Sequence, residues 1–198
     1  MFLFIFSDEL VLFKIVKKIR KSGGDFKLIY GVEAYFVDDV NEDISNLTAR
    51  QIKRYHQIIL VKNLVGLKNL YKLVSDAHLN NYKGRPLTLR SKLDELREGL
   101  IVGSACEAGE LFQAIFENKP EEELLRIADY YDYLEIQPLG NNQYLVENNT
   151  VADREGLIEL NKKIIDLQIS IRGTNQLNHH TILSPILFLS NNPMLLLT

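Results

Sequence analysis

The stretch Gln57-Ile58-Ile59-Leu60-Val61 decides the fold class, because a nearly continuous apolar run is typical of a strand that is buried on both faces. Apolar residues at helical spacing follow it over residues 67–77. The same order returns with the apolar run Leu100-Ile101-Val102, which precedes a helical pattern from Glu110 to Phe116. Strands that alternate with helices predict an α/β fold with a mainly parallel sheet or barrel.

Further elements extend this pattern on both sides. Residues 26–37 form the first strand-type run and residues 133–136 the last, and residues 153–167 carry the last clear amphipathic helix. Asn118-Lys119-Pro120 precedes three glutamates, which predicts a helix start with Asn118 as the N-cap. The chain therefore contains several strand and helix pairs, as an α/β fold requires.

Composition excludes several classes of protein. The 198 residues are 46% apolar and 25% charged, which is typical of a globular domain and not of a fibrous or disordered chain. The net charge of −3 provides no global positive field for nucleic acid. One cysteine excludes a disulfide framework and favours a reducing compartment. The apolar opening Phe2–Phe6 lacks a basic leader, so we expect a cytoplasmic protein with no membrane partner.

Charge is unevenly distributed along the chain. Between Gln168 and Thr198 the only charged residue is Arg172. We therefore expect a divergent N-terminal segment over residues 1–16, one folded body over residues 17–167, and a separate tail over residues 168–198.

Three residues with ligand chemistry lie at the edges of predicted strands, namely Glu33, His56 and Cys106. Strand ends converge on one rim of a parallel α/β fold, so residues that are distant in sequence can meet there. Carboxylate, imidazole and thiolate groups all bind zinc-like metals. The alternative is a half-buried glutamate, a strand histidine and a buried cysteine that serve packing alone.

Other candidates are weaker. The pair His179-His180 has ligand chemistry but no acidic residues around it to orient the rings, and His78 suits the surface end of a helix. Residues 62–90 are locally basic and include Tyr71 and Tyr82, which would suit a nucleic-acid face. A solvated helix and loop surface explains this basic segment more simply. Its cationic residues are Lys62, Lys68, Lys72, Lys83, Arg85 and Arg90.

Four motifs, in order and at fitting spacing, resemble one family. They are residues 30–39 (YGVEAYFVDD), 55–71 (YHQIILVKNLVGLKNLY), 97–115 (REGLIVGSACEAGELFQAI) and 131–146 (YDYLEIQPLGNNQYLV). From about Lys17 to Leu167 the chain is similar to the polymerase-and-histidinol-phosphatase (PHP) domain of the PolC-type alpha subunit of bacterial DNA polymerase III.

The resemblance implies an α/β fold, an incomplete, distorted PHP-type (β/α) barrel. In such domains His, Asp, Glu and Cys residues at strand ends hold a metal cluster. Position by position, Glu33, His56 and Cys106 match ligands of that cluster. The resemblance also implies a divalent metal of the zinc or manganese type. For the parent polymerase it implies DNA-directed DNA synthesis as the activity, with DNA and replisome subunits as partners.

The chain departs from the family pattern at several points. The family's His-x-His and Thr-Asp-His-Gly motifs are not in the sequence, no Asp-x-His strand end stands late in the domain, and the polymerase active site is not there either. Only Val40 to Arg54 stands where PolC-type proteins often carry a proofreading exonuclease. We therefore expect weak or no metal binding and no activity from this chain by itself.

Three functions follow from these observations. The first is a fragment of the PHP domain of a PolC-type replicative polymerase. The second is a stand-alone metal-dependent PHP-type phosphoesterase in which His179 and His180 replace missing ligands. The third is a non-catalytic module that binds a polymerase partner. For the tail we expect an out-of-frame translation after about Leu167, since its codons can spell family residues in a shifted frame.

Overall fold

The computed structural model describes residues 2–5, 14, 17–19, 21–23, 27–174 and 187–188. These residues fall into two compact units, which divide between Val102 and Gly103. Residues 168–174 of the predicted tail (168–198) continue the last helix, and the rest of that tail, with His179 and His180, lies outside the described residues apart from Leu187 and Phe188.

The first unit is organised around one long strand. Strand β2 (Lys27–Val37) pairs with β1 (Phe2–Ile5), with β3 (Tyr55–Val61) and with β4 (Leu87–Leu89). Strand β5 (Leu100–Gly103) extends the sheet beyond β3. The α/β fold class is confirmed, and the described sheet is open.

The sheet is mixed rather than mainly parallel. Strand β2 runs parallel to β1 and β4 but antiparallel to β3, with Gly31 opposite Leu60 and Phe36 opposite Tyr55. The expectation of a mainly parallel sheet was wrong for this pair because a buried apolar run has the same composition in either direction. The connector between β2 and β3 contains no crossover helix, which leaves an antiparallel return as the simple solution.

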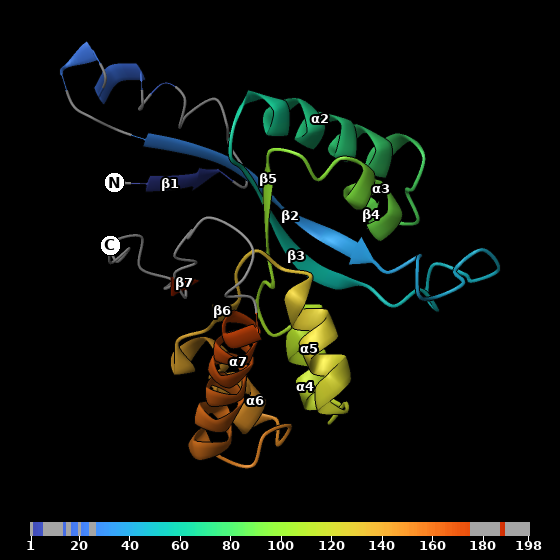
Figure 1. Cartoon of the computed structure of the whole chain (residues 1–198), viewed down its shortest axis with the longest axis vertical. Helices are drawn as coiled ribbons and strands as arrows, with labels where there is room; N and C mark the ends of the chain where they lie inside the picture. The colour runs from blue at the N-terminus through green and yellow to red at the C-terminus, as the bar shows by residue number, and fades with distance from the viewer. Residues whose placement is uncertain are drawn as a thin grey trace. The chain divides into compact units, whose positions relative to one another are not determined.

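Two helices cover this sheet. Helix α2 (Leu64–Leu79) packs against β3 and β4, and the short helix α3 (Arg90–Glu95) packs beside β4 (Figure 1). Leu70, Leu73 and Ala77 of α2 are buried, at the spacing of one helix face. The fully buried Phe36 and Ile59 supply the sheet side of this core.

The connector between β2 and β3 has a small core of its own. Val37, Ile52 and Leu87 are buried together. Partly buried apolar side chains pack around them, namely Tyr35, Ile44, Leu47 and Leu89. This cluster explains how a connector of turns holds a defined path without regular structure.

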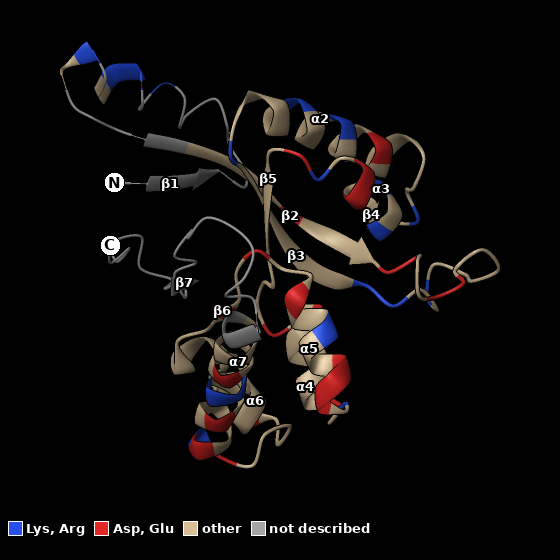
Figure 2. Cartoon of the chain, in the orientation of Figure 1, with Lys and Arg blue, Asp and Glu red and all other residues tan. Residues whose placement is uncertain are grey.

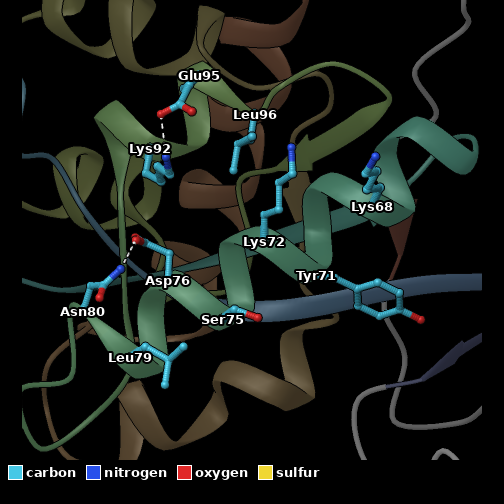
Figure 3. A pocket seen from close by; sticks show the side chains of 10 residues that line it. All are labelled: Lys68, Tyr71, Lys72, Ser75, Asp76, Leu79, Asn80, Lys92, Glu95 and Leu96. Atoms are coloured by element: carbon cyan, nitrogen blue, oxygen red, sulfur yellow. Dashed lines mark hydrogen bonds and ion pairs between the residues drawn. The ribbon is translucent and has the colours of Figure 1, made fainter.

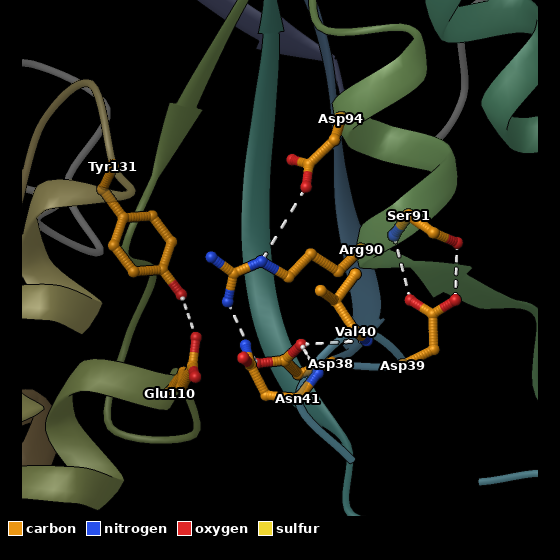
Figure 4. A network of polar contacts seen from close by, with 9 residues as sticks. All are labelled: Asp38, Asp39, Val40, Asn41, Arg90, Ser91, Asp94, Glu110 and Tyr131. Atoms are coloured by element: carbon orange, nitrogen blue, oxygen red, sulfur yellow. Dashed lines mark hydrogen bonds and ion pairs between the residues drawn. The ribbon is translucent and has the colours of Figure 1, made fainter. Parts of the chain in front are cut away.

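A buried ion pair joins the end of β2 to the start of α3. Arg90 Nη1 lies 3.0 Å from Asp38 Oδ2, and their side chains are only 15% and 6% exposed. Asn41 donates to the same carboxylate, and Ser91 N donates to Asp39 Oδ1 at 2.9 Å (Figure 4). Burial acts to raise the pKa of Asp38, but the hydrogen bonds from Asn41 and the charge of Arg90 outweigh it and hold that pKa below its usual range.

The second unit is mostly helical. Helices α4 (Glu110–Phe116), α5 (Glu121–Asp129) and α7 (Arg154–Thr174) pack against one another (Figure 1). The 3-10 helix η1 (Leu139–Asn142) and helix α6 (Gln143–Glu147) connect the short strand β6 (Glu135–Ile136) to α7. Strand β6 pairs in parallel with β7 (Leu187–Phe188).

The predicted N-cap of α5 was wrong by two residues. Pro120 holds the cap position, whereas Asn118 has a φ of 53° and its N–H bonds to the Ile115 carbonyl at 3.0 Å. Asn118 therefore ends α4 in the left-handed conformation that asparagine tolerates, and it does not begin α5. The three glutamates do occupy the first turn of α5, where the helix dipole favours them.

We expect Arg90→Ala to lower the free energy of unfolding by about 3 kcal/mol, because it leaves a buried carboxylate without its cation. The folded-state pKa of Asp38 is lowered, so its contribution is present above about pH 4 and is lost as the pH falls through the folded-state value. The variant should thus lose less stability than the parent chain on acidification. Urea unfolding at neutral and acidic pH measures both effects. Arg126→Ala, on the exposed face of α5, is the matched control, and an equal loss in both variants would contradict the assignment.

Gly66 and Gly99 meet backbone to backbone where α2 begins. A Cβ on Gly66 would lie 1.8 Å from the Gly99 carbonyl oxygen, and Gly99 has a φ of +75°. Alanine normally stabilises a helix interior relative to glycine by about 1 kcal/mol. We expect Gly66→Ala to destabilise the chain instead, by more than about 2 kcal/mol, since backbone must move. Thermal unfolding measures this change, with Gly140→Ala as the control, because a Cβ there meets nothing within 4 Å. A stabilised Gly66→Ala variant would refute this reading of the contact.

Candidate metal centre

The pairing of β2 with β3 places Glu33 and His56 on one face of the sheet. Tyr35 stands opposite His56 and Glu33 opposite Ile58, and residues that face each other across an antiparallel pair share a side. His56 Nδ1 lies 2.9 Å from Glu33 Oε1. The His56 and Glu33 side chains are 34% and 43% exposed, so an ion from solvent can reach both.

Aromatic and cationic groups fix the histidine ring from the side. The Tyr35 ring meets the His56 ring edge to face, with centroids 5.5 Å apart and an interplanar angle of 73°. The Arg85 guanidinium lies over the Tyr35 ring at 4.7 Å and also donates to the Tyr35 hydroxyl. The stack therefore restricts the rotation of Tyr35 and, through it, of His56.

Cys106 belongs to the second unit, where it follows β5 in a tight turn. Ala105, just before it, has a φ of 60°, in the left-handed region that L-residues rarely adopt. The Cys106 carbonyl accepts the N–H of Gly109 at 2.9 Å, and Gly109 is the residue that precedes α4. The side chain of Cys106 is partly exposed, as a ligand or a reactive thiol requires.

Buried polar contacts hold the turn that carries Cys106. Ser104 is 3% exposed, and its Oγ accepts the backbone N–H of Glu135 at 2.9 Å. Ser104 N in turn donates to the Tyr133 carbonyl at 3.3 Å. Burial, and then the charge of Glu135, raises the pKa of the Tyr133 hydroxyl, which therefore stays protonated. These contacts tie the turn to β6.

Two further tyrosines order this part of the second unit. The Tyr144 hydroxyl donates to Glu107 Oε1 at 3.0 Å. Burial, the hydrogen bond to Glu107 and the nearby charges of Glu107 and Cys106 raise the pKa of Tyr144 to about 12. The Tyr131 hydroxyl donates to the buried carboxylate of Glu110 at 3.1 Å (Figure 4).

The predicted site residues thus have different outcomes. Glu33 and His56 are brought together, and their oxygen and nitrogen donors suit a divalent cation. Cys106 lies in the second unit, and its membership of the site stays a prediction, as does that of His179 and His180. His78 is a surface residue of α2, with Nδ1 2.8 Å from the Val74 carbonyl oxygen.

Sequence reasoning missed three supporting residues. Tyr35 is two positions from Glu33 in one strand, so the period of two would have placed it on the same face. Ser104 and Glu135 meet across 31 residues, and no local pattern signals that contact.

Comparison with known proteins identifies the family. The family model of the PHP domain matches residues 4–163, and the chain belongs to this family. The proteins named DNA polymerase III PolC-type are similar to it. That of Clostridium perfringens (strain 13 / Type A) is 50% identical over 137 residues, which cover 69% of this chain and 10% of that protein. That of Bacillus subtilis (strain 168) is 42% identical over 131 residues, 66% of this chain and 9% of that protein.

The extent of these matches bears on function. The Caldanaerobacter subterraneus subsp. tengcongensis protein of the same name is 42% identical over 146 residues, again 10% of its length. The chain therefore spans about a tenth of the curated relatives that it matches. PHP domains generally depend on metal ions, which agrees with the paired Glu33 and His56. Within the part of the chain that the structure describes, no helix is long and apolar enough to cross a bilayer.

We expect Ser104→Ala to cost about 1–3 kcal/mol in stability, because it leaves the buried N–H of Glu135 without an acceptor. The turn should also loosen, so a thiol reagent should modify Cys106 faster than in the parent chain. Chemical unfolding and the modification rate measure the two effects. Ser75→Ala, at an exposed position of α2, should change neither, and an unchanged modification rate in Ser104→Ala would count against the proposed support of the turn.

Proposed function

We propose that this chain is a PHP-domain segment of a PolC-type DNA polymerase III alpha subunit. The single observation that carries the proposal is the 50% identity over 137 residues to a PolC-type polymerase, confined to a tenth of that protein. The parent would synthesise DNA in chromosome replication, in the cytoplasm, with DNA and replisome subunits as its partners. This chain matches none of the remaining nine tenths, so we expect no polymerase activity from it alone.

We also propose that Glu33, His56 and Cys106 hold a divalent metal of the zinc or manganese type. The short distance between His56 Nδ1 and Glu33 Oε1 supports the first two residues as a pair. The thiolate chemistry of Cys106 and its match to the family's motif support the third. When bound, such an ion supplies Lewis-acid polarisation of a phosphoryl oxygen. Tyr35 and Arg85 would hold the His56 ring in its binding orientation.

The ligand set of this chain is smaller than the family's. The family's His-x-His and Thr-Asp-His-Gly motifs are not in the sequence, and the Asp76-Ala77-His78 triplet lies in helix α2 rather than at a late strand end, so three candidate ligands remain. Because affinity depends on a nearly complete coordination shell, we expect weak metal binding and little or no hydrolysis of phosphate esters.

Metal titration of the purified chain tests the site. Competition with a chromophoric chelator should give a dissociation constant for Zn²⁺ or Mn²⁺ in the micromolar range or weaker, far from that of a complete structural site. Glu33→Gln, His56→Asn and Cys106→Ser should each weaken binding at least about tenfold, since each removes one ligand of three. His78→Asn is the matched control and should leave the affinity unchanged. If Cys106→Ser also leaves it unchanged, the three-residue site is wrong.

Two further results would overturn the proposal that this chain is a segment of a PolC-type polymerase. Metal-dependent hydrolysis of p-nitrophenyl phosphate that is lost in His56→Asn would favour the stand-alone phosphoesterase. Sequencing of the gene with its flanks should reveal the rest of a polymerase, in the same frame or, if the tail after about Leu167 is out of frame, in a shifted one. Flanks that encode no polymerase would refute a segment of PolC.

A further inference from the structure

Helix α2 has one outward face that carries large apolar side chains. Its buried residues lie on the opposite side of the helix. Leu64 and Leu79 are 83% and 81% exposed and Tyr71 is 60% exposed. Spacings of seven and eight residues put these three on one stripe of the helix. A helix face that meets only water is normally polar, so this stripe points to a partner.

A pocket of about 500 Å³ continues this stripe towards α3. Residues of α2, including Tyr71, Ser75 and Leu79, line one side, and Lys92, Glu95 and Leu96 line the other (Figure 3). The pocket is open to solvent, and Leu96 and Leu79 give it an apolar component. All of these residues belong to the first unit, so the pocket is complete within it.

Some charged side chains of the pocket have hydrogen-bond or ion-pair partners, and others have no ion pair. Asp76 accepts hydrogen bonds from Asn80 and Asn81, at 2.8 and 2.7 Å. Glu95 is paired with Lys92 at 2.6 Å. Basic positions recur along α2, as Figure 2 shows in blue. Lys68 and Lys72 extend from the same side of α2 (Figure 3). Among the described residues, neither has an ion-pair partner. Two ammonium groups that make no ion pair among the described residues therefore border the apolar stripe, and the carboxylates of Asp76 and Glu95 line the same pocket.

We propose that this face of α2, together with the pocket beside α3, binds an acidic amphipathic segment of a partner protein. Carboxylates of the segment would pair with Lys68 and Lys72, and its apolar side chains would cover Leu79 and Tyr71. A nucleic-acid strand suits the face less well, because phosphates and sugars gain nothing from the exposed aliphatic side chains of Leu64 and Leu79. The partner that fits is therefore a peptide with both Asp or Glu and Leu or Phe on one side.

Binding of a defined probe to the full chain tests this surface. The probe is a fluorescein-labelled 16-residue helical peptide of Glu, Leu and Ala, with Leu and Glu along one side. We expect saturable anisotropy with a dissociation constant of roughly tens of micromolar, typical of a small interface that depends on charge. The affinity should fall with added salt, because the ammonium groups are exposed.

Variants separate the specific surface from general charge. The double variant K68E/K72E should bind the probe at least about tenfold more weakly and Leu79→Ser about fivefold more weakly, since charge and apolar contact both contribute. K83E/K162E makes the same change in net charge on other surfaces and should bind within about twofold of the parent chain. All of these side chains are exposed, so circular dichroism should report an unchanged fold.

Three results would overturn the proposal. The first is no saturable binding of the probe up to millimolar concentration. The second is an equal loss of affinity in K83E/K162E and in K68E/K72E. The third is displacement of the probe by an oligothymidine of 16 nucleotides that itself binds more tightly, which would assign the face to nucleic acid. None of these results bears on the proposal that the chain is a segment of the polymerase, or on its proposed metal ligands, because both are tested separately.

Discussion

The antiparallel register between β2 and β3 is the constraint on which the rest of the first unit depends. It puts Glu33 and His56 on one side of the sheet and leaves Phe36 and Ile59 for the core under α2. A slip of one residue would exchange these two sets, burying a carboxylate and exposing the core. The ion pair of Asp38 with Arg90 holds the end of β2 against α3, and the turn cluster around Ile52 holds the return to β3. Register, core and candidate site are thus consequences of one pairing.

Much of the fold follows from local pattern. The apolar runs at 57–61 and 100–102 are strands, and the helical spacing after them gives α2 and α4, because burial demands those periods. Strand direction could not be predicted, since composition does not encode which way a neighbour runs. The error at Asn118 has a different cause. An asparagine followed by proline serves equally well as the end of one helix or the start of the next, and only the backbone conformation distinguishes them.

The candidate site, like the fold, contains features that the sequence predicts and features that it does not. Glu33 and His56 were predicted from their places at strand edges, but Glu33 lies inside β2, and the antiparallel pairing with β3 brings the two side chains to 2.9 Å. Their role as metal ligands stays a prediction. The stack of Arg85 on Tyr35 was not predicted, because it joins residues 50 positions apart through a turn. The supports of the Cys106 turn are equally remote in sequence. Chemistry-bearing residues are visible in a sequence, whereas the contacts that orient them are long-range and depend on the completed fold.

The contact between Gly66 and Gly99 also limits how this sequence can drift. A Cβ on Gly66 would strike the main chain of Gly99, and a Cβ on Gly99 would strike the main chain of Gly66 as well as the Asn63 side chain, and main chain cannot be exchanged. No substitution at one position can therefore compensate for a substitution at the other, which removes the usual two-step route of paired replacement. Both positions are locked together as glycine for as long as α2 starts against β5, and a lineage can escape only by an insertion or deletion that separates the two elements.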